Sequence, residues 1–188
     1  MKIVTLLGSP RKRGNTATIL GMFEGLVAAR HEVVRIDICD HRVQGCLGCD
    51  RCQKVLHEPG CAQKDDAPAI LARLMAADAI VYASPVYCWC FTAQMKALLD
   101  RHYCLVKWQE GEVVEALLEG KRAALLATCG GTAEENADLM QQVFARQMRY
   151  VGCRPVGTYV VGECTTPREL GTRATEAAAR MAREIAGV

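Results

Sequence analysis

Apolar residues in this chain form short continuous runs that alternate with segments of helical spacing. Five runs rich in Val, Ile, Leu and Ala have the length of strands: 2–7, 32–38, 79–83, 122–128 and 156–161. Elsewhere apolar residues recur at helical spacing, which predicts helices at 16–29 and 68–76 and further helices beginning at Thr92, Thr132 and Pro167. This alternation indicates a doubly wound α/β fold, with a five-stranded parallel sheet and helices on both faces.

Several of the predicted helices carry residues that commonly cap a helix. Thr92 is expected to cap the helix that follows it. Thr132 and Glu135 have the spacing of a capping box. Asp65-Asp66 is expected to cap the helix at 68–76.

Two further expectations concern the middle of the chain. His102 lies at a predicted helix end, where its charge is expected to act as a cap. The stretch 103–120 is longer than a usual connection, which predicts a surface excursion or a subunit contact.

Composition and charge narrow the class of protein. With 188 residues, 51% of them hydrophobic, the chain can bury about 70% of its unfolded surface, so we expect one domain over residues 1–188. A net charge of +2 gives no strong field for nucleic acid. No apolar run approaches the roughly 20 residues that span a bilayer, and residues 1–8 are too short for a signal peptide. A cytoplasmic protein without a nucleic-acid or membrane partner is expected.

The loop after the first strand has the donors that a phosphate needs. It reads Gly-Ser-Pro-Arg-Lys-Arg-Gly-Asn-Thr from Gly8 to Thr16. Its hydroxyls, the Arg11 guanidinium and the amides that open the next helix can converge on one anion. The loop has neither the Gly-Lys-Ser/Thr ending of a triphosphate site nor the Gly-x-Gly-x-x-Gly of a pyrophosphate site. A terminal phosphomonoester fits better, which points to flavin mononucleotide (FMN).

The chain has 11 cysteines, and four of them form the cysteine-rich loop at 46–61. An odd number without a secretory signal makes a disulfide framework a poor explanation, so reduced thiols, metal ligands or redox groups are favoured. The four are Cys46, Cys49, Cys52 and Cys61.

Several motifs together resemble the NADPH-dependent FMN reductase family of flavodoxin-like proteins. They are Gly-Ser-Pro-Arg at 8–11, Gly-Asn-Thr at 14–16, Ser-Pro-Val-Tyr at 84–87, Thr-Ala-Gln-Met-Lys at 92–96 and Asp-Arg at 100–101. The four cysteines before Asp65-Asp66 resemble the iron-sulfur flavoprotein branch of that family. The likeness runs from Met1 to about Arg101, with a weaker echo at 128–131. It implies a flavodoxin-like FMN-binding domain, NAD(P)H as the electron donor, and a homodimer or homotetramer.

The resemblance also implies which residues bind FMN. The first loop would hold the phosphate through Ser9, Arg11, Asn15, Thr16 and Ala17. The loop after the third strand would cradle the flavin ring through Pro85, Val86 and Tyr87. Cys88 and Trp89, which follow them, are further candidates for the flavin site but are not part of the resemblance. The loop after the fourth strand would lie alongside through Thr128, Cys129, Gly130 and Gly131.

The chemistry of a flavin supports this assignment independently. The ring needs an aromatic or apolar wall, which Tyr87 and Trp89 can supply, and close backbone approach, which Gly130 and Gly131 allow. The alternative is that both aromatic residues are ordinary packing or interface residues. Cys88-Trp89-Cys90 departs from the small residues usual in the family after this tyrosine.

The four cysteines have three explanations. Three cysteines at intervals of three, with a fourth farther along, can hold a [4Fe-4S] cluster. Four thiolates can also hold a structural zinc ion. The third explanation is a set of free or reversibly oxidised thiols. The gap between Cys52 and Cys61 is slightly longer than is usual in the iron-sulfur branch.

The sequence therefore predicts an FMN-dependent oxidoreductase in which the flavin carries the chemistry and no side chain is catalytic. Electrons from NAD(P)H or from a ferredoxin-like donor would pass to a small-molecule acceptor. Two alternatives stay open: a flavodoxin-like electron carrier without its own substrate, and a thiol- or zinc-based binding protein. Slight basicity argues against the carrier, because such carriers are acidic.

Overall fold

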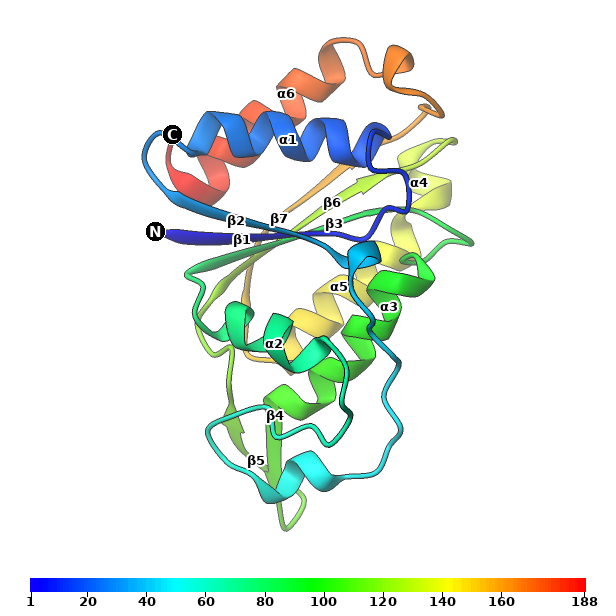
Figure 1. Ribbon diagram of the computed structural model, residues 1–188. Helices are drawn as coiled ribbons and strands as arrows, with labels where there is room; N and C mark the ends of the chain where they lie inside the picture. The colour runs from blue at the N-terminus through cyan, green and yellow to red at the C-terminus, as the bar shows by residue number, and fades with distance from the viewer.

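The computed structural model describes residues 1–188 and has a five-stranded parallel sheet at its centre (Figure 1). The strand order is β2-β1-β3-β6-β7, and every neighbouring pair is parallel. The strands are β1 (Lys2–Leu7), β2 (Glu32–Asp37), β3 (Ala79–Pro85), β6 (Arg122–Thr128) and β7 (Arg154–Val161). This is the flavodoxin-like order, so the predicted fold class is confirmed.

Helices cover both faces of the sheet (Figure 1). On one face lie α1 (Asn15–Val27) and α6 (Thr172–Met181), which a π-helical turn extends over Ala182–Ala186. On the other face lie α2 (Ala67–Met75), α3 (Ala93–Asp100) and α5 (Asp138–Tyr150), and the short α4 (Ala133–Asn136) precedes α5. None of these helices has the length and apolar character that a membrane crossing needs.

The central strands are continuously apolar because both sides of them are buried. In β1, Val4 and Leu6 belong to the core beneath α2, α3 and α5, whereas Ile3 and Leu7 belong to the core beneath α1 and α6. All four side chains are fully buried. Successive side chains of β1 point to opposite faces of the sheet, so one apolar run contributes to both cores. Strands of parallel sheets are commonly buried on both faces in this way.

The stretch 103–120 is more regular than expected. It contains an antiparallel hairpin of β4 (Val106–Gln109) and β5 (Glu112–Ala116). Glu110 and Gly111, at the turn, both have positive φ, the conformation of a tight two-residue hairpin turn. Figure 1 places this hairpin beside the cysteine-rich loop. The strands are too short for periodicity to reveal them, so the hairpin was not predicted, and the expected surface excursion or subunit contact stays a prediction.

Thr92 caps α3 as predicted and also holds the first loop. Its Oγ1 accepts from the Met95 amide at 3.3 Å and donates to the Gly8 carbonyl at 2.6 Å. A Cβ on Gly8 would lie 2.7 Å from the Met95 Cβ, so only glycine allows this approach. The cap therefore fixes the loop after β1 against the start of α3.

Two other helix starts differ from expectation. Thr132 precedes α4 but makes no capping hydrogen bond with its side chain, so the predicted box with Glu135 is wrong. A capping box occurs instead between Thr166 and Glu169, at a 3-10 turn over Pro167–Glu169, and α6 begins only after Gly171. At the head of α2, Asp65 Oδ1 accepts from the Ala67 amide at 3.2 Å.

His102 does not serve as a charged cap. It lies in the 3-10 helix Arg101–Leu105, is fully buried, and neither ring nitrogen has a hydrogen-bond partner. Its ring meets the edge of Tyr82 at a centroid distance of 5.7 Å. Burial lowers the pKa of His102 to about 3, so the ring is neutral in the folded protein.

The buried histidine predicts a dependence of stability on pH. Below about 6.5 the unfolded chain protonates this residue but the folded protein does not, so acid favours unfolding by up to about 1.4 kcal/mol per pH unit down to pH about 3. We expect His102→Leu to flatten the decline in unfolding free energy between pH 7 and 5, measured by urea titration. The exposed His57→Leu is the control, and equal slopes for the two variants would contradict this account.

Candidate functional site

The first part of the site is the turn between β1 and α1. Ser9 Oγ accepts from the Arg11 amide at 3.2 Å, and the Gly14 amide donates to the Arg11 carbonyl at 2.9 Å. Gly14 is the N-cap of α1 and makes no side-chain capping bond, and the first turn of the helix has no acidic residue. The opening amides of α1 are therefore available to an anion.

A pocket of about 260 Å³ opens at the carboxyl ends of β1, β3 and β6. This is where the strand order reverses, the usual ligand site of such sheets. A larger and more open hollow of about 470 Å³ lies over β7 and α6, at the edge of the sheet. The smaller pocket is the better candidate because its position and its hydroxyls both suit a nucleotide.

Most of the predicted FMN residues line this pocket, and some do not. The lining residues among them are Ser9, Arg11, Asn15, Thr16, Pro85, Val86, Tyr87, Thr128, Cys129 and Gly130. Ala17, Cys88, Trp89 and Gly131 lie outside the lining. Gly14, Cys164 and Thr165 also line it and were missed. Cys164 and Thr165 follow the last strand, in a segment without a motif.

Two hydrogen bonds join the loops around the pocket. Thr16 Oγ1 lies 2.7 Å from Thr128 Oγ1, and Asn15 Nδ2 donates to the Cys164 carbonyl at 2.9 Å. Asn15 Oδ1 is buried and has no partner. An unpartnered buried acceptor is costly, so it favours a ligand that brings a donor, such as a hydroxyl of a ribityl chain. The pocket thus offers donors for a phosphate and an acceptor for a polyol.

Gly131 has a local reason to be glycine. A Cβ there would lie 2.4 Å from Asn136 Nδ2. A Cβ on Gly130 would meet only Thr165 at 3.5 Å, an ordinary contact. Packing against α4 is therefore one reason for glycine at 131, and the approach of a ligand there stays a prediction.

The loop after β3 ends in a strained two-residue turn. Tyr87 and Cys90 exchange two backbone hydrogen bonds of 2.9 and 3.0 Å. Cys88 and Trp89 between them have φ values of 48° and 60°, a region that asparagine and glycine usually occupy. The turn directs Trp89 away from the pocket. Its Nε1 instead donates to the Glu135 carbonyl at 3.2 Å. Tyr87 alone of the two aromatic residues borders the pocket.

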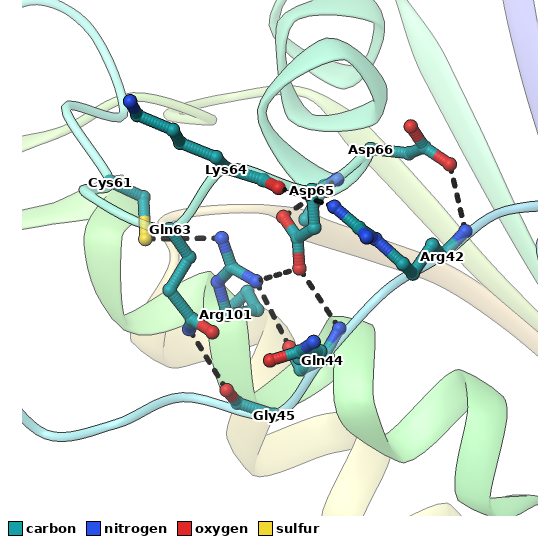
Figure 2. Close-up of polar contacts among 10 residues, drawn as sticks. Arg42, Gln44, Gly45, Cys61, Gln63, Lys64, Asp65, Asp66 and Arg101 are labelled. Atoms are coloured by element: carbon teal, nitrogen blue, oxygen red, sulfur yellow. Dashed lines mark hydrogen bonds and ion pairs between the residues drawn. The ribbon is translucent and has the colours of Figure 1, made fainter.

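The second part of the site is the cysteine-rich loop, whose two ends are held together. Asp65 Oδ2 accepts from the Gln44 amide at 2.9 Å, and Gln63 Nε2 donates to the Gly45 carbonyl at 2.9 Å. Asp66 Oδ2 accepts from the Arg42 amide at 2.7 Å (Figure 2). The segments 42–45 and 63–66, on either side of the loop, are thus joined by hydrogen bonds. We call this paired region the neck of the cysteine-rich loop.

Arg101 ties the neck to α3, as Figure 2 shows. Its Nη1 donates to Asp65 Oδ2 at 2.6 Å and to the Gln44 carbonyl at 3.0 Å, and its Nη2 donates to Cys61 Sγ at 3.1 Å. The Arg101 side chain is fully buried and the Asp65 side chain is 2% exposed. Burial alone would raise the pKa of Asp65, but the Arg101 guanidinium and the Gln44 amide outweigh burial and lower it.

All four cysteines of the loop line one small pocket, together with Arg101. Cys46 and Cys49 are exposed, Cys61 is half-buried and Cys52 is buried. No three His, Cys, Asp or Glu side chains converge as the ligands of one metal ion do. Thiolates around zinc lie roughly 3.8 Å apart, since each Zn–S bond is about 2.3 Å. The structure therefore brings the four thiols to one pocket, without the convergence that a single zinc ion requires.

The buried pair at the neck gives a stability prediction. Asp65→Asn leaves the Arg101 guanidinium buried without its counter-charge, so we expect a loss of about 3 kcal/mol in unfolding free energy. Asp66→Asn is the matched control, because its carboxylate is half exposed and should cost no more than about 1 kcal/mol. Urea unfolding of both variants measures the difference, and equal losses would contradict a special role for the pair.

Comparison with known proteins identifies the family. The NADPH-dependent FMN reductase family matches residues 1–161. The chain is 32% identical to an iron-sulfur flavoprotein of Archaeoglobus fulgidus over 99% of this chain and 79% of that protein. It is 31% identical to an FMN-dependent NADH:quinone oxidoreductase of Bordetella petrii over 60% of this chain and 55% of that protein. It spans about half the length of several other iron-sulfur flavoproteins that it matches.

A solved structure shows the same fold. The NAD(P)H:quinone oxidoreductase from Methanothermobacter marburgensis has a TM-score of 0.73 and 22% identity, over 99% of this chain and 96% of that one. The fold, the pocket at the reversal of strand order and the family match agree with one another. The chain therefore belongs to the NADPH-dependent FMN reductase family and is a flavin-dependent oxidoreductase.

Proposed function

We propose that this protein oxidises NAD(P)H with FMN bound in the pocket at the ends of β1, β3 and β6, and reduces a small acceptor. The observation that carries the proposal is the composition of this pocket. It combines free amides at the start of α1, the Arg11 guanidinium and an unpartnered buried acceptor, Asn15 Oδ1. A quinone-like acceptor is favoured, because two of the similar proteins carry that activity in their names.

The residues around the phosphate would bind rather than react. Ser9 Oγ, Arg11 and the first amides of α1 would hold the phosphate, and Thr16 would fix the loop against Thr128. Asn15 Oδ1 would accept a hydrogen bond from the ribityl chain. When bound, FMN would accept a hydride from the nicotinamide and release electrons singly or in pairs.

The residues around the flavin ring would shape its surroundings. Tyr87 would cover part of the ring and keep water from it, while the backbone of Cys129 and Gly130 would lie at its edge. Burial raises the pKa of the Cys129 thiol, which keeps it protonated and unreactive at neutral pH. The protein therefore binds and orients, and supplies no nucleophile of its own.

Cys46, Cys49, Cys52 and Cys61 are proposed to hold a [4Fe-4S] cluster as a second redox centre. Their thiols line one pocket on a loop whose ends are fixed at the Asp65 neck. Four thiolates are the donor set of such a cluster. The likeness of the chain to an iron-sulfur flavoprotein of Archaeoglobus fulgidus, which spans 99% of this chain, supports the proposal.

A homodimer or homotetramer is part of the proposal. The turn at Cys88-Trp89 leaves Trp89 57% exposed, and Leu139 is 51% exposed. Both residues line the same shallow hollow over α5. A second copy that covered this surface would bury apolar area beside the flavin pocket.

The role of the first loop can be tested by ligand binding. Arg11→Ala removes a charged donor to phosphate, so we expect FMN affinity to fall roughly tenfold to a hundredfold, measured by quenching of flavin fluorescence. Riboflavin, which has no phosphate, should bind both proteins equally. Arg13→Ala is the matched control, because Arg13 does not line the pocket. An equal loss for FMN and riboflavin would place Arg11 elsewhere than on the phosphate.

The proposed function as a whole can be tested on protein purified without oxygen. We expect bound FMN, about four irons and four sulfides per chain, and steady oxidation of NADH or NADPH with a quinone. A yellow protein without iron that turns over would remove the cluster and keep the reductase. Flavin without turnover, reduced only by a ferredoxin, would favour the electron carrier, and a colourless protein that takes up no FMN would refute the proposal.

A further inference from the structure

Lys107 is a buried ammonium without a carboxylate partner. It lies in β4, is fully buried, and its Nζ donates to the carbonyl oxygens of Cys52 at 3.0 Å and Pro59 at 3.2 Å. It takes part in no salt bridge of the structure. Burying a charge against two neutral acceptors alone is costly, so the position favours an anion nearby.

The two carbonyls place the ammonium within the cysteine-rich loop. Cys52 is the third of the four cysteines, and Pro59 comes two residues before the fourth, Cys61. Arg101 reaches the same pocket and donates to Cys61 Sγ at 3.1 Å. Lys107 therefore lies beside the segment that joins two of the proposed cluster ligands.

The charges around the loop do not balance while the thiols are neutral. Arg101 is neutralised by Asp65 at 2.6 Å, whereas Lys107 has no such partner. Two carboxylates lie in the neighbourhood of Lys107, those of Glu58 and Glu115. Glu58 is exposed, and Glu115 Oε1 lies 3.0 Å from His57 Nδ1. One positive charge is left over inside the protein, held by backbone carbonyls of the cysteine-rich loop.

We propose that the buried charge of Lys107 neutralises part of the negative charge of a [4Fe-4S] cluster and raises its reduction potential. The inference rests on the cluster proposed above. Four thiolates give an oxidised cluster a net charge of −2, and one added electron makes it −3, with no bond formed or broken. A fixed positive charge stabilises the more negative form more strongly, and net charge near the sulfurs is one of the terms that set such potentials.

Two variants separate the charge from the hydrogen bonds. Lys107→Gln keeps a donor for the Cys52 and Pro59 carbonyls but has no charge, and Lys107→Met has neither. Lys54→Gln is the matched control, because Lys54 is exposed on the same loop. All proteins are purified without oxygen and titrated with dithionite, while EPR follows the cluster and visible absorbance follows the flavin.

We expect the cluster of both Lys107 variants to be reduced at a lower potential than in the wild type and in Lys54→Gln. The flavin potential should be the same in all four proteins, since the two pockets share no residue. A cluster potential in Lys107→Gln equal to that of Lys54→Gln would overturn the inference and leave the cluster itself in place. A wild type that contains zinc, or no metal, would overturn the cluster and this inference together.

Loss of iron from Lys107→Gln is also informative. If the variant keeps FMN and its circular dichroism but not its iron, Lys107→Arg decides the cause, because it restores the charge on a different side chain. Iron retained in Lys107→Arg supports the role of the charge. Iron lost from both variants would show that Lys107 acts through packing, and the inference would be wrong.

Discussion

The buried ion pair between Arg101 and Asp65 joins the cysteine-rich loop to the α/β body. Asp65 closes the neck of the loop, and Arg101 follows directly after α3. Because both side chains are almost completely buried, each needs the other, and removal of either leaves a desolvated charge. The position of Cys61, which accepts from the same guanidinium, depends on this pair.

α3 connects the cysteine-rich loop to the flavin pocket, because each end of the helix holds one of the two sites. At its first turn, Thr92 holds the Gly8 carbonyl and so fixes the loop that forms the phosphate side of the flavin pocket. Beyond its last turn, Arg101 holds the cysteine-rich loop. One helix of eight residues thus positions parts of both proposed centres, and Met95 packs so closely on Gly8 that the two sites are fixed to a common frame.

The sequence predicted the features that arise from local periodicity and from backbone chemistry. The five strands and the Thr92 cap follow from apolar runs and a capping residue, and the first side of the pocket follows from a glycine- and hydroxyl-rich loop. The lining residues after β3 and β6 were predicted from the family resemblance. The hairpin β4–β5 was missed because strands of four and five residues are too short to show a period. The position of Trp89 was missed because two residues without glycine or asparagine form a positive-φ turn there.

The two sites contain different kinds of buried polar side chain, and no pattern in the sequence predicts this difference. The buried polar residues around the flavin pocket carry hydroxyls: Ser9, Thr16, Ser84, Thr92 and Thr128. The buried amide oxygen of Asn15 adds a neutral acceptor. The buried cations, Arg101 and Lys107, both lie at the cysteine-rich loop, and the buried His102 is neutral.

This difference has an electrostatic consequence. A phosphate at the first loop would be held by dipoles and by the exposed Arg11, so salt would screen the charged part of its binding. At the cysteine-rich loop, Arg101 and Lys107 are buried, so salt screens their charges much less than the charge of Arg11. The arrangement suits a flavin site that must admit soluble partners and a second centre whose charge state is set from within the protein.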